Sequence, residues 1–350
     1  MVFLVSIAFT LCVTRNLFAA AMLFSIFSFL SASLFVVLDA ADVAMTEAAV
    51  GAGVSTILLL STLASTGYRV RKRPPGRNQL ALAVSIAVGA TLVYATLDMP
   101  RFGDPLAPVH VHPIANHYIN ISPKETGIPN MVTPLLASYR GYDTFGETAV
   151  VFTAGIGVLA LIGRRRREDG TPLRANGLPD DTAKRHRVLR VVSKQVIPAI
   201  LLYACYVQAH GDYGPGGGFQ AGVIFASGLI LYMLIFGVDA AERAIPPKTL
   251  ERLIALGLLL YGTVGVVSIV QGGAFLDYRT LSHDPKHGLH YGIIAIELGV
   301  GITVTAVITT IVYSFAAFLQ DEVLGELAGQ SSTSLSGERA STESDDPVGA

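Results

Sequence analysis

The chain has no tryptophan, only two cysteines and little charge. Of its 350 residues, 15% are charged, against about 25% in soluble domains. The 25 Lys and Arg residues are balanced by 26 Asp and Glu residues, so no basic excess points to a nucleic-acid partner. Cys12 and Cys205 both lie inside apolar runs, which argues against a structural disulfide. These shortages exclude a disulfide scaffold and an ordinary soluble domain.

Apolar residues take the place of charge: they make up 51% of the chain, and the mean hydropathy is +0.54. They form nine runs: Val2–Val13, Leu17–Leu38, Val43–Leu63, Leu80–Thr96, Thr144–Ile162, Val191–Gln208, Gly217–Gly237, Leu253–Gln271 and Gly292–Phe318. A membrane-spanning helix needs about 20 residues. The first run is short, but it lacks the basic leader and cleavage site of a signal peptide, and we interpret it as a short span. We expect an all-α, polytopic transmembrane bundle of about nine spans.

Basic residues predict the orientation of the spans through the positive-inside rule. In a nine-span topology, 20 of the 25 Lys and Arg residues fall on one side of the membrane. The other five are Arg101, Lys124, Arg140, Arg279 and Lys286. This alternation places the N-terminus outside and the C-terminus in the cytoplasm.

Charged linkers divide the chain into parts. We expect a three-span module over 1–70 and a two-span module over 71–165, with a long outer loop at 98–143. A basic cytoplasmic linker at 166–190 then leads to a four-span domain over 191–320. The tail, 321–350, is rich in Ser, Thr, Gly and acidic residues and is predicted to be disordered.

A glycine-rich stretch separates the sixth and seventh apolar runs: His210-Gly-Asp-Tyr-Gly-Pro-Gly-Gly-Gly-Phe-Gln-Ala-Gly222. Pro215 and the glycines Gly216, Gly217 and Gly218 should break a helix and allow a tight turn or the close approach of another helix or an ion. A plain linker is an equally good reading. No Gly-Lys-Ser/Thr follows the glycines, so this is not a phosphate-binding loop.

Acidic residues occur at the start of several spans, where an ionisable group costs at least about 2.5 kcal/mol on insertion scales. Asp42 opens the third span and suits a helix N-cap, whereas Glu47 lies about 7.5 Å deeper, too deep for capping. Glu297 lies inside the last span, beside Gly299 and Gly301. A purely structural hydrogen bond between helices is the alternative role for Glu297.

Arg140, Asp143 and Glu147 open the fifth span. If the helix begins that early, all three share one face, and Arg140 could neutralise either acid. A cap with a surface ion pair would explain Asp143 equally well. Glu147 is followed by an unbroken apolar run, which favours a functional role.

Two basic groups have both structural and functional interpretations. Lys194 enters the sixth span from the cytoplasmic side, where it could extend to the interface or take part in proton transfer. His210 adjoins the glycine turn, where it could relay protons or only hydrogen-bond the turn. His283, His287 and His290 have a spacing seen in metal sites, but without cysteines we predict no metal site.

In this topology Glu47, Glu147 and Glu297 lie at similar depth on helices that enter from outside. They could line one hydrated vestibule that attracts cations, although sequence does not show whether they converge.

Together these motifs resemble the B-type subunit of the Mrp-type multisubunit cation/proton antiporters over nearly the whole chain. Asp42-Val-Ala-Met-Thr-Glu-Ala-Ala-Val-Gly51 resembles a small component of membrane-bound hydrogenases (MbhD-like). Pro129-Asn-Met-Val-Thr-Pro and Arg140-Gly-Tyr-Asp-Thr-Phe-Gly-Glu147 resemble a second such module (MbhE-like). The glycine-rich stretch and Glu297-Leu-Gly-Val300 resemble the MnhB module.

The resemblance implies a secondary-transporter subunit, not an enzyme, without a cofactor of its own. It would exchange Na⁺ or another monovalent cation for protons in the cell membrane of a prokaryote, with the A-, C-, D-, E-, F- and G-type Mrp antiporter subunits and membrane lipid as partners. Glu147 matches an ion-handling candidate of that family, and Glu47 and Glu297 occupy acidic positions of their modules. The alternatives are a membrane-arm subunit of a hydrogenase-like or respiratory complex, whose redox centres would lie in its partners, and a scaffold without its own ion path.

Overall fold

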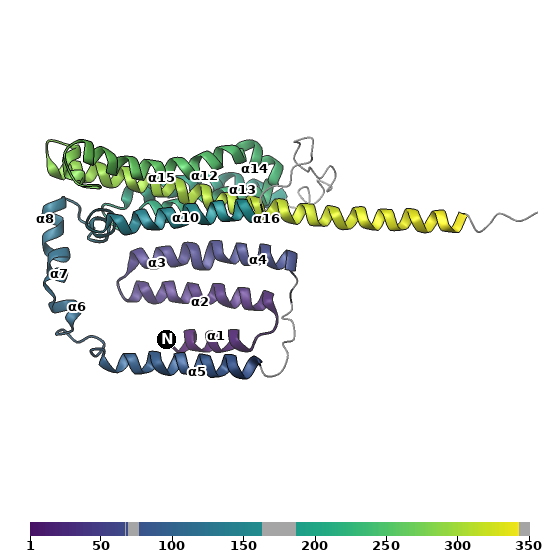
Figure 1. The fold of residues 1–350 in the computed structure, drawn as a ribbon, viewed down its shortest axis with the longest axis horizontal. Coiled ribbons are helices and arrows are strands. Elements are labelled where there is room, and N and C mark those ends of the chain that lie inside the picture. Colours follow the sequence, from purple (N-terminus) through teal and green to yellow (C-terminus); the bar gives the residue numbers. More distant parts are fainter. Residues whose placement is uncertain (67, 69–76, 163–186, 343–350) are drawn as a thin grey trace, which may run out of the picture.

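The computed structural model describes residues 1–66, 68, 77–162 and 187–342. Within these ranges every regular element is a helix, and eight helices are long and apolar enough to cross a membrane. They lie roughly parallel in a bundle (Figure 1). The expected all-α transmembrane bundle is confirmed.

The long helices follow the predicted runs. They are α2 (Leu17–Val37), the continuous stretch α3 (Ala41–Glu47), η1 (Ala48–Val54) and α4 (Ser55–Thr66), then α5 (Arg77–Ala95), α10 (Gly141–Ile162), α12 (Arg187–His210), α13 (Gly218–Phe236), α15 (Pro247–Val270) and α16 (Pro285–Thr342). The first run forms α1 (Val2–Val13), which with 12 residues is shorter than the other spans. Within the described residues, eight of the nine expected runs therefore form helices of spanning length, and the first forms a short helix, as expected.

The last helix extends further than the sequence suggested. A disordered tail is expected from residue 321, whereas α16 continues as a helix through Thr342. No proline occurs between Pro285 and Pro347, so nothing in this stretch forces the helix to end. Residues 343–350, the 69–76 part of the first basic loop and the 163–186 part of the basic linker lie outside the described residues.

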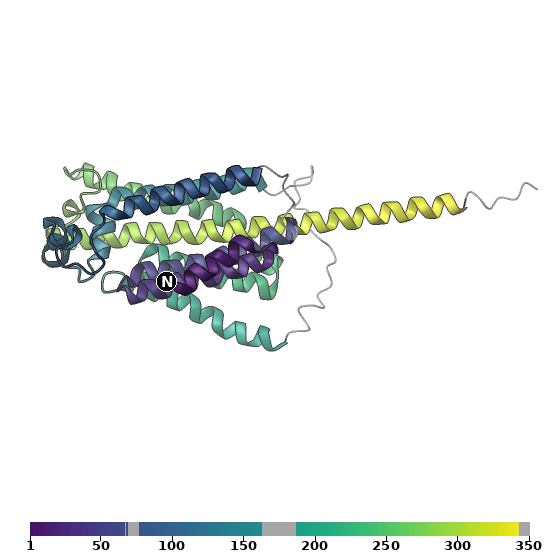
Figure 2. The ribbon, with the colours of Figure 1, turned by 90° about the horizontal axis from the view of Figure 1, so that it is seen from below.

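The packed core lies around α16, which runs through the middle of the bundle (Figure 2). Tyr261, Ile293 and Ile296 are fully buried in it. Small residues bring the helices close together: a Cβ added to Gly257 of α15 would lie 2.5 Å from the carbonyl oxygen of Gly299 in α16. One added to Gly222 of α13 would lie 2.8 Å from the carbonyl oxygen of Gly301. These contacts place α13 and α15 directly against α16.

Short helices cover one end of the bundle: η2 (Thr96–Asp98), α6 (Pro108–Val111), α7 (Pro113–Asn116), η3 (His117–Ile121), α8 (Ser122–Thr126), α9 (Val132–Pro134), η4 (Leu135–Tyr139) and η5 (Tyr278–Leu281). At the opposite end, α14 (Val238–Ala244) joins α13 to α15. The buried hydroxyl of Tyr278 donates to the carbonyl oxygen of Ala137 at 3.0 Å, and that of Tyr261 donates to Gly141 at 2.7 Å. The long loop and the segment before α16 therefore meet at the same end.

Candidate ion-binding site

The glycine-rich stretch forms a tight turn between α12 and α13. The N–H of Gly217 donates to the carbonyl oxygen of Val207 at 3.2 Å, and Gly217 has a φ of +121°, which favours glycine. A Cβ on Gly216 would lie 2.5 Å from that same carbonyl oxygen, and one on Gly218 would collide with the carbonyl oxygen of Glu297. The glycines therefore let the turn pack against the middle of α16.

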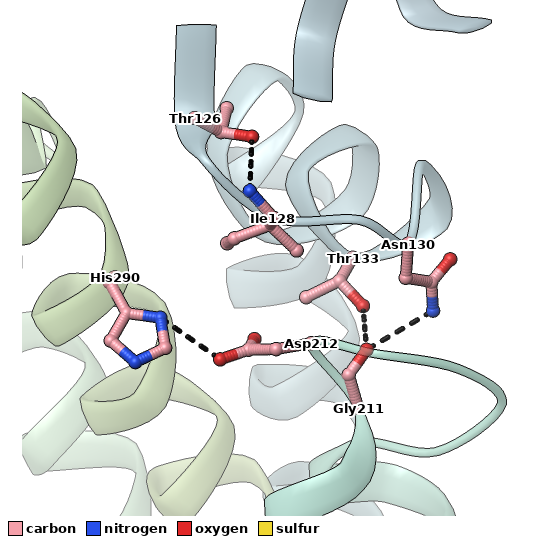
Figure 3. Close-up of polar contacts among 7 residues, drawn as sticks. All are labelled: Thr126, Ile128, Asn130, Thr133, Gly211, Asp212 and His290. Atoms are coloured by element: carbon pink, nitrogen blue, oxygen red, sulfur yellow. Dashed lines mark hydrogen bonds and ion pairs between the residues drawn. The ribbon is translucent and has the colours of Figure 1, made fainter. Parts of the chain in front are cut away.

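A second segment, before α9, holds this turn in place. The amide of Asn130 donates to the carbonyl oxygens of Gly211 at 3.1 Å and Gly214 at 3.0 Å. The hydroxyl of Thr133, which is buried, donates to Gly211 at 2.6 Å, as Figure 3 shows. The N–H of Asn130 also donates to the carbonyl oxygen of Asp212 at 3.1 Å. The 98–143 loop and the glycine turn thus form one hydrogen-bonded unit.

A buried carboxylate points from the turn towards α16. Oδ2 of Asp212 lies 3.0 Å from Nδ1 of His290, and the side chain of Asp212 is only 8% exposed. Burial raises the pKa of Asp212, and the nearby His290 partly offsets that rise. Sequence reasoning missed this pair, although His290 lies seven residues before Glu297, which is about two turns along the same helix face.

Beside the turn lies a cavity of 540 Å³ that collects three carboxylates. Asp42 comes from α3, Glu147 from α10 and Glu297 from α16. Oδ1 of Asp42 accepts the N–H of Gly216 at 3.2 Å, which ties the cavity wall to the turn. The polar residues Thr46, Thr133, Thr144 and Gln220 and the glycines Gly216, Gly217 and Gly218 also line it.

A single carboxylate of this cavity could hold a small cation directly or through water, because hard monovalent and divalent cations prefer oxygen ligands. The described acids do not lie close enough for three of them to bind one metal ion together. Threonine hydroxyls, the amide of Gln220 and backbone carbonyls would supply further oxygens. The remaining wall is apolar, with Val132, Leu136, Val150, Ile296 and Val300 among its residues. Asp42 and Glu297 are half-buried beside this wall and are therefore incompletely solvated, whereas Glu147 is exposed at the mouth of the cavity.

Comparison with known proteins identifies the fold around this cavity. A family model described as a domain related to the MnhB subunit of Na⁺/H⁺ antiporters matches residues 188–310. A putative antiporter subunit mnhB2 from Staphylococcus haemolyticus is 35% identical over 132 residues, which are 37% of this chain and 93% of that protein. The chain belongs to the MnhB family of antiporter subunits.

The chain is longer than the MnhB domain alone. Two further family models, described as the D and E subunits of MBH, match residues 2–68 and 76–174. A probable A/B-type subunit of a K⁺/H⁺ antiporter from Rhizobium meliloti is 30% identical over 270 residues, covering 69% of this chain. A chain in the solved structure of the Mrp complex from Dietzia sp. DQ12-45-1b superimposes with a TM-score of 0.71 and 26% identity over 90% of this chain. This MnhB-family chain spans 26% of the former protein and 34% of the latter chain.

Two of the three predicted glutamates of this MnhB-family chain meet in the cavity. Glu147 and Glu297 line it, whereas Glu47 is not among the described residues that do. Oε1 of Glu47 lies over Gly51 and next to Ser28, both on the packed face between α2 and η1. Asp42 takes the place expected for Glu47, because it lies closer to the turn.

Arg140, Asp143 and Glu147 do not all lie together, although they were predicted to share one helix face. Helix α10 begins at Gly141, so Arg140 precedes it. The guanidinium of Arg140 lies 2.5 Å from Oδ2 of Asp143, and both side chains are more than half exposed, at 62% and 51%. The structure therefore pairs Arg140 with Asp143 at the surface, while Glu147 faces the cavity.

The remaining candidates lie apart from the carboxylates. Lys194 is exposed on α12. The ring of His210 stacks on Tyr206 with centroids 5.0 Å apart, and its Nε2 abuts Gly214. No group of three His, Cys, Asp or Glu side chains that could hold a metal ion occurs in the part of the chain that the structure describes.

Proposed function

We propose that this chain is a membrane subunit of a multisubunit antiporter that exchanges a monovalent cation for protons, and that its cavity takes part in ion handling. The observation that carries the proposal is the convergence of Asp42, Glu147 and Glu297 from three helices on one cavity. The membership of the MnhB family and the likeness to the Mrp complex support it.

The chemistry follows from placing acids where water is scarce. A carboxylate beside apolar walls favours either protonation or a bound cation over the bare charge, since the charged form is poorly solvated there. A proton and a cation therefore compete for the same oxygens. If the site faces each side of the membrane in turn, that competition couples the two fluxes.

The names of the relatives do not agree on a cation, since one is described as a K⁺/H⁺ antiporter component and the family model refers to Na⁺/H⁺ antiporters. Nothing in the cavity distinguishes the two cations by charge. We propose Na⁺ as the first cation to test, because its smaller radius gains more from close carboxylate oxygens.

We further propose a cell-membrane location with the N-terminus and the turn outside and the C-terminus in the cytoplasm. The division into modules at 1–70, 71–165 and 191–320 is part of the same proposal, with other Mrp-type subunits as partners. Helix α5 supports the need for partners or lipid, because nearly all of its described side chains are exposed.

The test is Na⁺-dependent proton flux in membrane vesicles that contain the assembled complex. Glu147→Gln preserves the shape of the side chain and removes its charge, and we expect at least a tenfold loss of flux, about 1.4 kcal/mol. Glu251→Gln is the matched control, since Glu251 is exposed on α15 outside the cavity. Normal flux in an assembled Glu147→Gln complex would exclude this residue from the ion path. Normal flux after neutralising Asp42 and Glu297 as well would favour the scaffold role.

A further inference from the structure

Antiport through the cavity requires a place where protons enter from the aqueous phase. We propose that the His290–Asp212 pair is this place, and that it exchanges protons between the outer solution and Glu297. The inference rests on the proposed function of the cavity. It assigns a role to two residues that lie outside the cavity lining.

The pair bridges an exposed and a buried environment. His290 is 38% exposed, whereas the side chain of Asp212 is 8% exposed. One ring nitrogen of His290, Nδ1, is occupied by Oδ2 of Asp212 at 3.0 Å, so Nε2 is left to meet water. Figure 3 shows the two side chains facing each other, His290 from α16 and Asp212 from the turn. An imidazole can accept a proton at one ring nitrogen and release one from the other, which suits a proton relay.

The buried carboxylate of Asp212 has an oxygen that can accept a proton. Oδ1 of Asp212 is buried and makes no hydrogen bond to any described residue. A buried acceptor without a donor costs free energy, and protonation of the carboxylate removes much of that cost. Burial also raises the pKa of Asp212, with His290 partly opposing the rise.

The turn brings this carboxylate next to the cavity. Gly211, which precedes Asp212, packs so closely that a Cβ on it would lie 3.3 Å from Oε2 of Glu297. The charges of Asp212 and Asp42 both act on Glu297. Asp212 therefore contacts the partly exposed His290, and its charge acts on the cavity acid Glu297.

The proton transfer balances without any further reactant. His290 takes a proton from water at Nε2 and releases the Nδ1 proton to Oδ2 of Asp212, so the ring becomes neutral with its proton on Nε2. A flip of the ring, or proton exchange with water at both nitrogens, restores the Nδ1–H form before the next transfer. Asp212 becomes a neutral acid. It then passes its proton to the carboxylate of Glu297 and regains its negative charge. The reverse sequence releases a proton to the outer solution.

Other titratable groups lie on the elements at this end of the bundle, while the shift in the pKa of Asp212 itself comes from burial and His290. They are Asp42 on α3, Glu297 on α16, the pair Asp284 and His287 at the start of α16, His210 at the end of α12, and Glu125, Arg279 and Lys286 on the elements packed at this end. His287 is exposed and lies 3.6 Å from Asp284, which makes it a suitable control.

The experiment compares His290→Gln with His287→Gln in vesicles that contain the assembled complex. Glutamine can still donate a hydrogen bond to Asp212 but cannot relay a proton, so a purely structural role would survive this change. We expect His290→Gln to slow Na⁺-dependent proton flux at least fivefold and to flatten the dependence of that flux on outside pH. We expect His287→Gln to retain flux.

A second measurement separates this inference from the proposed function. This measurement is the number of protons released at equilibrium when Na⁺ is added to the detergent-purified complex. It should be the same in His290→Gln as in the wild type, because the cavity acids are intact. A His290→Gln complex with wild-type flux and pH profile would overturn the inference while leaving the cavity in place. Should His290→Gln fail to assemble, Asp212→Asn replaces it, since asparagine keeps the size of the side chain but cannot carry the proton. Wild-type flux in that variant would equally overturn the inference.

Discussion

Acidic side chains in this chain differ mainly in what surrounds them. Asp143 and Glu125 lie in hydrogen-bonded or ion-paired surface positions, whereas Asp42 and Glu297 lie beside apolar walls in the cavity. Surface ion pairs contribute little to stability, with a median of about 0–1 kcal/mol. Half-buried acids such as Asp42 and Glu297 are costlier than these surface pairs, which is why we assign them a role in ion handling.

The surface contact between Glu125 and Tyr139 gives a prediction about pH. The phenol of Tyr139 donates to Oε2 of Glu125 at 2.5 Å and holds the pKa of that carboxyl below its ordinary value. Because the pKa of Glu125 is lower in the folded state than in the unfolded state, its ionised form stabilises the fold. This stabilisation is fully present above the unfolded-state pKa of about 4.3, and it is lost as the pH falls through the folded-state pKa. Tyr139→Phe should therefore lower the thermal midpoint at pH 7, and the difference from wild type should disappear at low pH.

The check is the thermal midpoint of the purified protein measured over pH, with Tyr142→Phe as the control. Tyr142 is exposed, and its ring contacts Phe275, not a carboxylate. The difference in thermal midpoint between wild type and Tyr139→Phe could also stay the same at a pH where carboxyl groups are protonated. That result would show that the hydroxyl does not act through Glu125.

Sequence predicted the chemistry of single residues better than their partners. The depth of Glu147 and Glu297 in their spans follows from residue counts, because a helix rises about 1.5 Å per residue. Residue counts do not show whether Asp42 or Glu47 reaches the cavity, since that depends on which face of α3 meets the turn. Asp212 was hidden among glycines, and its partner His290 lies 78 residues away in the chain.

At the scale of elements, glycine and threonine determine how closely the helices approach. Gly257 packs against Gly299 and Thr303, and Gly218 packs against the backbone of Glu297. Helices in lipid gain little from the hydrophobic effect, so close van der Waals contact between small residues has to hold them together. Hydropathy predicts where each span lies, but it carries no information about which spans touch.

A single added methyl group tests this packing. In Gly257→Ala the new Cβ would lie 2.5 Å from a backbone carbonyl oxygen that cannot move alone. Overpacking of this kind costs about 1–3 kcal/mol, so we expect a lower thermal midpoint and less assembled protein in the membrane. Gly157→Ala is the control, because no atom lies within 4 Å of its added Cβ. Its stability should be equal or higher, since alanine favours a helix by about 1 kcal/mol over glycine. Equal behaviour of the two variants would contradict the close packing of α15 on α16.

At the scale of the whole molecule, the 98–143 loop, the glycine turn and the start of α16 meet at one end, beside the cavity acids. The alternation of basic loops predicts that these segments share one side of the membrane, and the hydrogen bonds between them agree with it. The helical continuation of α16 to Thr342 was not predicted, because low hydropathy and many Ser residues are typical of disorder but do not forbid a helix.

The central claim is that protons and a monovalent cation compete for the cavity carboxylates. The most direct measurement is the pH change when Na⁺ is added to the purified complex in weakly buffered solution, with choline as the cation control. We expect the wild type to release protons, and the triple variant Asp42→Asn, Glu147→Gln and Glu297→Gln to lose the part of that release that comes from this cavity. A triple variant that assembles and releases as many protons as the wild type would contradict the account.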